Sequence, residues 1–312
     1  LMNFRLDCEA SDEMHGIISR MGRTEDVKFS PDNRRLALAG FAASQIAIFD
    51  ICIESRSGPV KIAVLDHFIL SSPSLKSPHG VSFIDNDTII VANREGYVDV
   101  FQLPATGVSG QTINVTPLHT IKGNRFGRLH SPGSVGIYET TPGRCSILVC
   151  NNYTHVVTSH SLKIKSRFGI LNKGVLLQKG LSIPDGISIS TNQKWIAVSN
   201  HGTGTVLVYA NTSQMNRMSE PAGICQGINC PHGLRFAGHD RYLLVAAAAA
   251  PYIHVFESDN GDWTGTRDPT KTVRVLDEAT FLRGRNNAEE GGPKGIDVDQ
   301  TMRVLVSTCE HQ

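Results

Sequence analysis

The stretch PDGISISTNQKWIAVSN, residues 184–200, contains the pattern that decides the fold. It begins with a Pro-x-Gly turn, continues through a short alternating segment and a polar turn, and ends with a second apolar segment. Alternation of apolar and polar residues over a few positions is typical of half-buried strands. The stretch therefore predicts a pair of antiparallel strands joined by a tight turn.

Five further stretches repeat this pattern along the chain. They are TEDVKFSPDNRRLALAG (24–40), PHGVSFIDNDTIIVAN (78–93), PGSVGIYETTPGRCSILVCN (132–151), PHGLRFAGHDRYLLVAA (231–247) and PKGIDVDQTMRVLVST (293–308). The second positions of successive units lie 47 to 62 residues apart. A period near 50 residues with several short strands in each unit is typical of propeller blades.

Most units continue into a third strand, such as TVLVYA (205–210), and a less regular fourth, such as KIAVLDHFI (61–69). We therefore predict an all-β fold, a six-bladed β-propeller of four-stranded antiparallel blades, as a single domain over residues 1–312. The blades are expected to begin near residues 24, 78, 132, 184, 231 and 293.

The sixth unit reaches the end of the chain after only two strands. The N-terminal segment offers two short candidates, NFRLD (3–7) and GIIS (16–19). We expect residues 1–22 to complete the last blade with these strands, because such closure removes exposed sheet edges. A truncated seventh blade is the alternative.

Composition excludes several classes of function. The net charge of +1 gives no basic surplus for nucleic acid or an anionic membrane. The apolar runs are too short to span a bilayer, and no signal peptide is visible, so we expect a cytoplasmic protein with reduced thiols. Nucleophile-elbow, Walker A, H-E-x-x-H and dinucleotide-binding motifs are absent.

The units PHGLRFAGHDRYLLVA, PDGISISTNQKWIAVSN and PHGVSFIDNDTIIVANREGYVDVF resemble the repeats of several propeller families. These are the NHL-repeat proteins, the gluconolactonase-like (senescence-marker-like) proteins, the virginiamycin B lyase type and the seven-bladed bacterial lactonases. The resemblance extends over nearly the whole chain at the level of single blades. It implies hydrolysis or lyase chemistry on small cyclic esters, or plain binding.

The gluconolactonase-like resemblance also implies a metal site. Those proteins hold a divalent metal with a Glu of the first blade, an Asn of a Pro-Asn-Gly and an Asp of a Pro-Asp-Gly. Glu25 and Asp185 match the first and last of these roles, whereas Gly133 stands where the Asn would be. The lyase type carries a catalytic His on a blade loop, which His79 or His232 resembles.

The repeat places the candidate site residues at one mouth of the central channel. In a propeller blade, the start of the innermost strand and the end of the second strand lie at the same end of the channel. We expect Glu25, His79, Asp185 and His232 to be catalytic residues and candidate metal ligands there. The expected substrate-binding residues are Asn93, Asn151, Asn200, His201 and Lys294.

These residue types favour a divalent metal, since imidazole and carboxylate bind transition metals, and carboxylate with carboxamide suits Ca²⁺. Each residue also has a structural alternative. A histidine at a blade start is often a hydrogen-bonded structural residue, Lys294 could neutralise the carboxylates, and the three asparagines could cap turns.

The sequence thus leaves more than one function open. The first is a metal-assisted, lactonase-like hydrolase or a lyase that takes a small-molecule ligand in the central channel. The second is a non-catalytic propeller that binds a ligand or a protein. The third is a cofactor-free lyase or isomerase with a His and carboxylate pair.

One stretch departs from the repeat. The fifth unit runs into Ala246–Ala250, and Ala247 aligns with Asn93 and Asn200. We predict a strand end and turn here rather than a helix, with the polar rim residue of this blade missing. Natural loss and deliberate substitution of a site residue both remain open.

Overall fold

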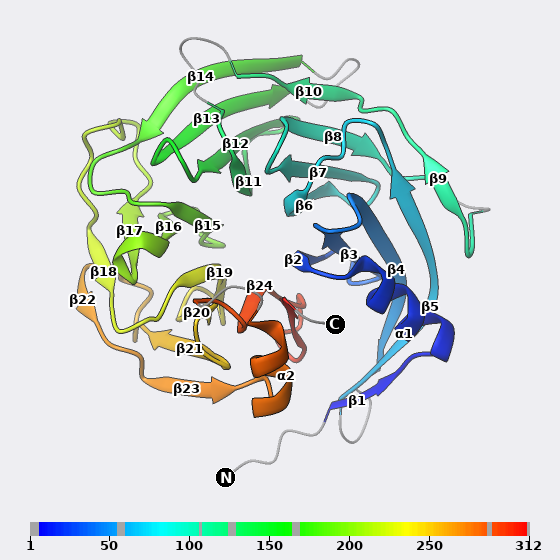
Figure 1. The fold of residues 1–312 in the computed structure, drawn as a ribbon. Helices are drawn as coiled ribbons and strands as arrows, with labels where there is room; N and C mark the ends of the chain where they lie inside the picture. Colours follow the sequence, from blue (N-terminus) through cyan, green and yellow to red (C-terminus); the bar gives the residue numbers. More distant parts are fainter. Residues whose placement is uncertain are drawn as a thin grey trace.

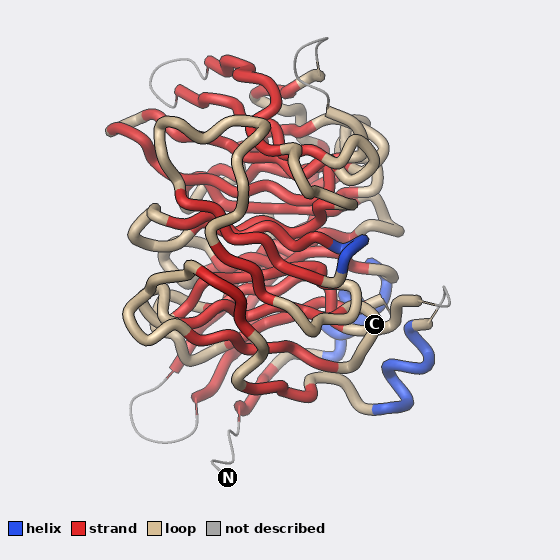
Figure 2. The backbone as a smooth tube through the Cα atoms, turned by 90° about the vertical axis from the view of Figure 1, so that its left-hand side faces the viewer, coloured by secondary structure: helices blue, strands red, loops and turns tan. Residues whose placement is uncertain are grey.

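The structure of the chain is a computed structural model that describes residues 6–54, 60–105, 108–123, 129–163, 169–285 and 289–310. Strands of the described residues form six sheets, arranged as a ring about a central axis (Figure 1). Viewed from the side, the ring is a stack of strands, with the helices toward one face (Figure 2). In its described residues, the chain is therefore an all-β propeller with two short α-helices and a single 3₁₀ turn, η1 (His201–Thr203).

The first sheet contains β1 (Leu6–Glu9), β2 (Thr24–Phe29), β3 (Arg35–Gly40), β4 (Gln45–Glu54), β5 (Val60–Ser71) and β9 (Thr112–Asn114). The second contains β6 (Pro78–Asp85), β7 (Thr88–Asn93), β8 (Val98–Gln102) and β10 (His119–Ile121). The third contains β11 (Pro132–Thr141), β12 (Arg144–Asn151), β13 (Val156–Lys163) and β14 (Gly169–Leu177).

The fourth sheet contains β15 (Pro184–Ile189), β16 (Trp195–Asn200), β17 (Thr205–Ala210), β18 (Gly223–Cys225) and β22 (Gly265–Arg267). The fifth contains β19 (Pro231–Ala237), β20 (Tyr242–Ala247), β21 (Tyr252–Glu257) and β23 (Lys271–Arg274). The last contains β24 (Pro293–Val298) and β25 (Leu305–Cys309).

The prediction of six four-stranded antiparallel blades is wrong. In the described part of the chain, five sheets have four to six strands and form blades, and the terminal sheet has only two. The blades are also not purely antiparallel, because β1 and β9 pair with β5 in parallel, as β22 does with β18. The larger sheets gain outer strands from other segments of the chain: β9 joins the first sheet and β22 joins the fourth.

The N-terminal segment does not close the last sheet. Of NFRLD, residues 3–5 lie outside the described range, and Leu6–Glu9 form β1 on the first sheet. GIIS lies inside helix α1 (Asp12–Met21), capped by Ser11. Met14, Ile17 and Met21 share one face of this helix, and they pack with the first sheet and with Val304 of the terminal segment. Helical spacing of these apolar residues therefore overrides the strand-like appearance of GIIS.

Glycines of the Pro-x-Gly turns allow the innermost strands to approach one another. A Cβ on Gly186 would lie 2.2 Å from the carbonyl oxygen of His232, and one on Gly233 would lie 2.4 Å from that of Lys294. A Cβ on Gly295 would lie 2.4 Å from the Cα of Asp26, so the last inner strand closes against the first. The third position of these units is therefore glycine because the inner strand of the next sheet leaves no room for a Cβ.

Candidate active site

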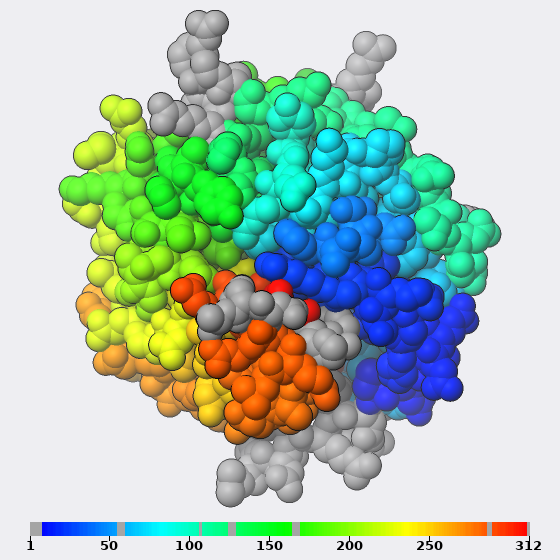
Figure 3. Space-filling view, in the orientation of Figure 1, coloured from blue at the N-terminus to red at the C-terminus, as the bar shows by residue number. Residues whose placement is uncertain are grey.

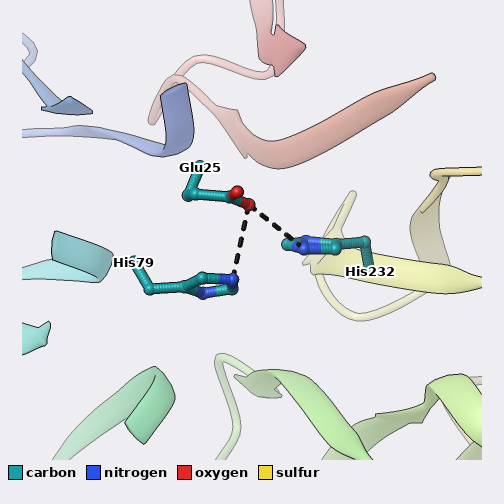
Figure 4. A group of neighbouring side chains, drawn as sticks. All are labelled: Glu25, His79 and His232. Atoms are coloured by element: carbon teal, nitrogen blue, oxygen red, sulfur yellow. Dashed lines mark ion pairs between the residues drawn. The ribbon is translucent and has the colours of Figure 1, made fainter. Parts of the chain in front are cut away.

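Second positions of four repeat units bring their side chains together at one end of the ring. Glu25, His79, Asp185 and His232 begin the inner strands β2, β6, β15 and β19, and each is at most 5% exposed. The two imidazole rings stack with their centroids 5.2 Å apart. Figure 4 shows both rings approaching the Glu25 carboxylate. These residues, far apart in the sequence, thus form one buried polar cluster.

The two carboxylate oxygens of Glu25 have different surroundings. Oε1 is paired with Arg23 and lies 3.4 Å from Nζ of Lys294. Oε2 lies 3.4 Å from Nε2 of His79 and 3.3 Å from Nε2 of His232, yet it accepts no hydrogen bond from the described residues. Burial acts to raise the pKa of Glu25, but Lys294 and the two histidines hold it well below its ordinary value. The carboxylate is therefore ionised, with one oxygen facing the imidazoles.

His79 is held as a neutral imidazole. Its Nδ1 lies 2.7 Å from the carbonyl oxygen of Gly133, to which it donates, and its Nε2 accepts from Nη2 of Arg94 at 2.6 Å. Burial, reinforced by the positive charge of Arg94, lowers the pKa of His79 to about 3. The carbonyl fixes the tautomer that carries its proton on Nδ1, which leaves the Nε2 lone pair to accept from Arg94.

His232 has the opposite environment. Its Nε2 lies 3.1 Å from Oδ2 of Asp185 as well as 3.3 Å from Glu25. Burial acts to lower the pKa of His232, but Asp185 and Glu25 raise it above its ordinary value. The pKa of Asp185 lies far below its usual range, because His232, His79 and Arg94 together outweigh its burial. The cluster thus pairs a neutral imidazole with one that favours its proton.

Lys294 lies beside the cluster with its side chain fully buried. Its Nζ is 2.8 Å from Oε2 of Glu290, 3.0 Å from Oε2 of Glu310 and 3.4 Å from Glu25. Burial acts to lower the pKa of Lys294, but these carboxylates raise it. The other oxygen of Glu290 lies 3.5 Å from Nε2 of His201. Lys294 is therefore a buried ammonium held by three carboxylates.

The donor set fits a divalent metal. Ligand atoms of Glu25, His79 and His232 all lie within 4.8 Å of one another. Two ligands bound to one tetrahedral zinc lie about 3.4 Å apart, which matches the distances from Oε2 of Glu25 to both imidazoles. Oε2 of Glu25 accepts no hydrogen bond from the described residues, which is a further sign that the cluster can accept a cation. Binding requires Arg94 to leave Nε2 of His79 and His232 to lose its proton.

The three asparagines predicted to bind substrate are occupied elsewhere. Asn93, Asn151 and Asn200 are buried at the ends of the second strands, and each Oδ1 accepts a backbone amide two residues before the proline that begins the same unit. Each Nδ2 donates to a backbone carbonyl and to another side chain. These bonds join each second strand to the loop that leads into its own inner strand.

Residues one position later reach the mouth instead. Arg94 contacts His79, Asn152 donates to Oδ1 of Asp185 at 2.9 Å, and His201 faces Glu290. Of these, only His201 was predicted. Side-chain alternation along the second strand could have predicted Arg94 and Asn152, because the residue after the asparagine points to the opposite side of the strand.

The glycine at the second position of the third unit makes room for Asn152. A Cβ on Gly133 would lie 2.2 Å from Oδ1 of Asn152 and 2.8 Å from Oδ1 of Asp185. Oδ1 of Asn152 is buried without a hydrogen-bond partner among the described residues. A carboxamide therefore enters the mouth from the second strand of the unit that lacks a side chain at its start.

A cavity of about 740 Å³ lies beside the cluster and is lined by one of its residues, Asp185. Its lining includes Arg23, Phe41, Arg94, Asn152, Asp185, His201 and Glu290. This volume suits a small ligand. The space between the inner strands, which Glu25, His79, Asp185 and His232 line, is only about 20 Å³, so no wide channel passes through the site.

The alanine run forms a strand end and a turn, as predicted. Ala247 ends β20 opposite Pro231, and Ala246, Ala247 and Ala248 are fully buried. By position, Ala248 corresponds to Arg94, Asn152 and His201. The side chain missing from the mouth is therefore that of residue 248 as well as the turn-capping group at 247.

No protein-family model and no curated protein sequence matches the chain. Among solved structures, it is similar to proteins of Bacteroides fragilis and Bacteroides uniformis that are provisionally named 6-phosphogluconolactonases. Both are 12% identical with a TM-score of 0.56, over 91% of this chain and 76% and 77% of theirs. A luciferin-regenerating enzyme is 11% identical with a TM-score of 0.51, over 89% of this chain and 81% of its own. At these identities, the likeness shows that the chain shares their β-propeller fold.

Proposed function

We propose that the protein is a small-molecule hydrolase of the lactonase-like kind, acting at the mouth with a divalent metal held by Glu25, His79 and His232. The observation that carries the proposal is Oε2 of Glu25, which faces both Nε2 atoms and accepts no hydrogen bond from the described residues. Asp185, which contacts His232, also lines the 740 Å³ cavity. When bound, such an ion polarises a carbonyl and activates water. The names of the similar structures favour a cyclic ester as substrate.

Residues around the cluster have roles in this proposal. Gly133 orients His79 through its carbonyl, which accepts from Nδ1, whereas Asp185 contacts the Nε2 atom of His232 that would bind the metal. Arg94 would leave His79 and donate to the carbonyl oxygen of the substrate, where negative charge develops during attack by water. Asn152 offers its carboxamide oxygen to a donor group of the substrate.

A second function is favoured by one observation. Arg94 already occupies Nε2 of His79, and Arg23 and Lys294 already pair with Oε1 of Glu25. A propeller with this charge balance could hold a small ligand in the cavity without a metal and without catalysis. The same residues would also allow a lyase or isomerase that uses His232 and Asp185 without a cofactor, but this function has less support than the other two.

Metal content separates these functions. The purified protein is analysed for bound metals and titrated with Mn²⁺, Zn²⁺ and Ca²⁺ while its melting temperature is followed, since an ion that binds the native state stabilises it. We expect stabilisation by Mn²⁺ or Zn²⁺, and hydrolysis of simple lactones followed by acid release. The His79→Ala/His232→Ala variant should lose both. Absence of any metal effect would exclude the metal-assisted hydrolase, and activity that survives the double change would exclude this site.

A further inference from the structure

Glu290 comes from outside the repeat and reaches the site between two sheets. One carboxylate oxygen lies 2.8 Å from Lys294 of the terminal sheet, and the other lies 3.5 Å from His201 of the fourth sheet. The fifth sheet lies between these two in the ring (Figure 1). Glu290 is thus at the place where Ala248 contributes only a methyl group.

The alanine turn is the surface on which this segment lies. The backbone amides of Gly291 and Gly292 both donate to the carbonyl oxygen of Ala248, at 2.9 and 2.8 Å. A Cβ on Gly292 would lie 2.2 Å from the carbonyl oxygen of Ala250 and 2.4 Å from that of Ala247. Close contact of two glycines with a turn of alanines therefore fixes where Glu290 projects. Helix α2 (Glu278–Gly284), in orange, precedes this segment on the same face (Figure 3).

We propose that Glu290 is a positioning residue of the site, which takes the place of the missing side chain of the fifth unit and holds Lys294 off the Glu25 carboxylate. Lys294 is nearest to Glu290, then to Glu310, and farthest from Glu25. Its ammonium therefore neutralises Oε1 of Glu25 only in part, and Oε2 keeps charge for a cation. The inference rests on the proposed function in one respect only, namely that the cation is a divalent metal.

Removal of the Glu290 charge tests this role. In Glu290→Gln, the ammonium keeps only Glu310 and Glu25 as charged partners from this set and acts more strongly on Glu25. We expect Mn²⁺, followed by loss of the free-ion EPR signal, to bind about 10-fold more weakly, as for other partners outside the ligand set. Glu289→Gln is the matched control, because it removes the same charge from the adjacent, exposed residue. Glu290→Asp should recover part of the affinity.

Displacement of the segment tests the alanine turn. Gly292→Ala should reproduce the loss seen in Glu290→Gln and increase hydrogen exchange at the amides of residues 291 and 292. Gly169→Ala is the matched control, since a Cβ there would meet no atom of the described residues within 4 Å. If Glu290→Gln binds Mn²⁺ as tightly as Glu289→Gln does, the proposal is wrong, whatever Gly292→Ala does.

A second measurement does not depend on metal. Hydrogen exchange of the Lys294 ammonium, followed by ¹⁵N NMR, is expected to be slow in the wild type and faster in Glu290→Gln, but unchanged in Glu289→Gln. If the wild type binds no Mn²⁺, the proposed hydrolase fails, and this exchange rate decides the role of Glu290. Equal rates in the two variants would then overturn the inference.

Discussion

Asn151 and Asn152 are neighbours in the chain, but their side chains lie in two regions that use buried polar groups differently. Asn151 belongs to the turns behind the mouth, where both ends of its carboxamide are hydrogen-bonded. Asn152 belongs to the floor of the mouth, where it donates to Asp185 and its Oδ1 has no partner among the described residues. Buried polar groups that are fully paired hold the fold, whereas groups left unpaired are available to a ligand.

The largest expected difference between the regions is in metal affinity. His79→Ala and His232→Ala each remove a proposed ligand, so we expect at least about a 100-fold loss of Mn²⁺ affinity, more than for residues outside the ligand set. Asn93→Ala, in the turns, should bind Mn²⁺ as the wild type does. Titration by EPR measures both, with circular dichroism to verify folding. Equal losses in the three variants would mean that the two regions do not differ.

Stability should show the reverse order. Asn151→Ala leaves the His130 amide, the Val149 carbonyl and the Thr158 hydroxyl without this partner, and we expect a loss of about 2 kcal/mol in the free energy of unfolding. Asn152→Ala removes one bond and an oxygen that has no partner, so its loss should be below about 1 kcal/mol. Urea unfolding of both variants gives the comparison. A larger loss for Asn152 would assign it to the scaffold.

The pH dependence of stability offers a smaller difference. Burial lowers the pKa of His160 to about 4, and its Nε2 is bonded to the same Thr158 hydroxyl that Asn151 contacts. Because the unfolded chain binds this proton below pH 6.5 and the folded chain does not, stability falls between pH 6.5 and about 4. Its slope has a limit of about 1.4 kcal/mol per pH unit for each such histidine.

His160→Gln removes one of these protons and should flatten the slope by up to that amount. His79, with a pKa of about 3, adds a second proton in the same range. His232 acts with the opposite sign, because its pKa is raised, and its contribution is lost as the pH rises above 6.5. Urea unfolding at several pH values measures the slope. An unchanged slope in His160→Gln would show that this histidine is already charged in the folded state.

The repeat was sufficient to predict the inner strands and what lies at their starts. Strand alternation and the Pro-x-Gly turns place Glu25, His79, Asp185 and His232 in equivalent positions, and equivalent positions meet in a ring. The second strands end at Asn93, Asn151 and Asn200 as predicted. Their asparagines bond to turns, and the residue after each one reaches the mouth, because a polar residue at a strand end has the same sequence pattern in both roles. This is why Asn93 was named and Arg94 was not.

Other features depend on contacts that the repeat does not encode. Helix α1 is recognisable from the spacing of Met14, Ile17 and Met21 and from its cap at Ser11, but the expectation of a completed last blade favoured strands there. Glu290 lies in an irregular segment, and its place is set by a backbone contact with Ala248. Only a three-dimensional structure brings that segment to the site.

The contact between Gly295 and Asp26 has a consequence for folding. It joins the last inner strand to the first, and the Glu25 and Lys294 side chains that meet beside it are 269 residues apart in the sequence. Contacts of such long range form late and slowly, because the loop they close is nearly the whole chain. The site would then form only when folding is complete. A ligand that joins Glu25 to His232 would slow the opening of the ring.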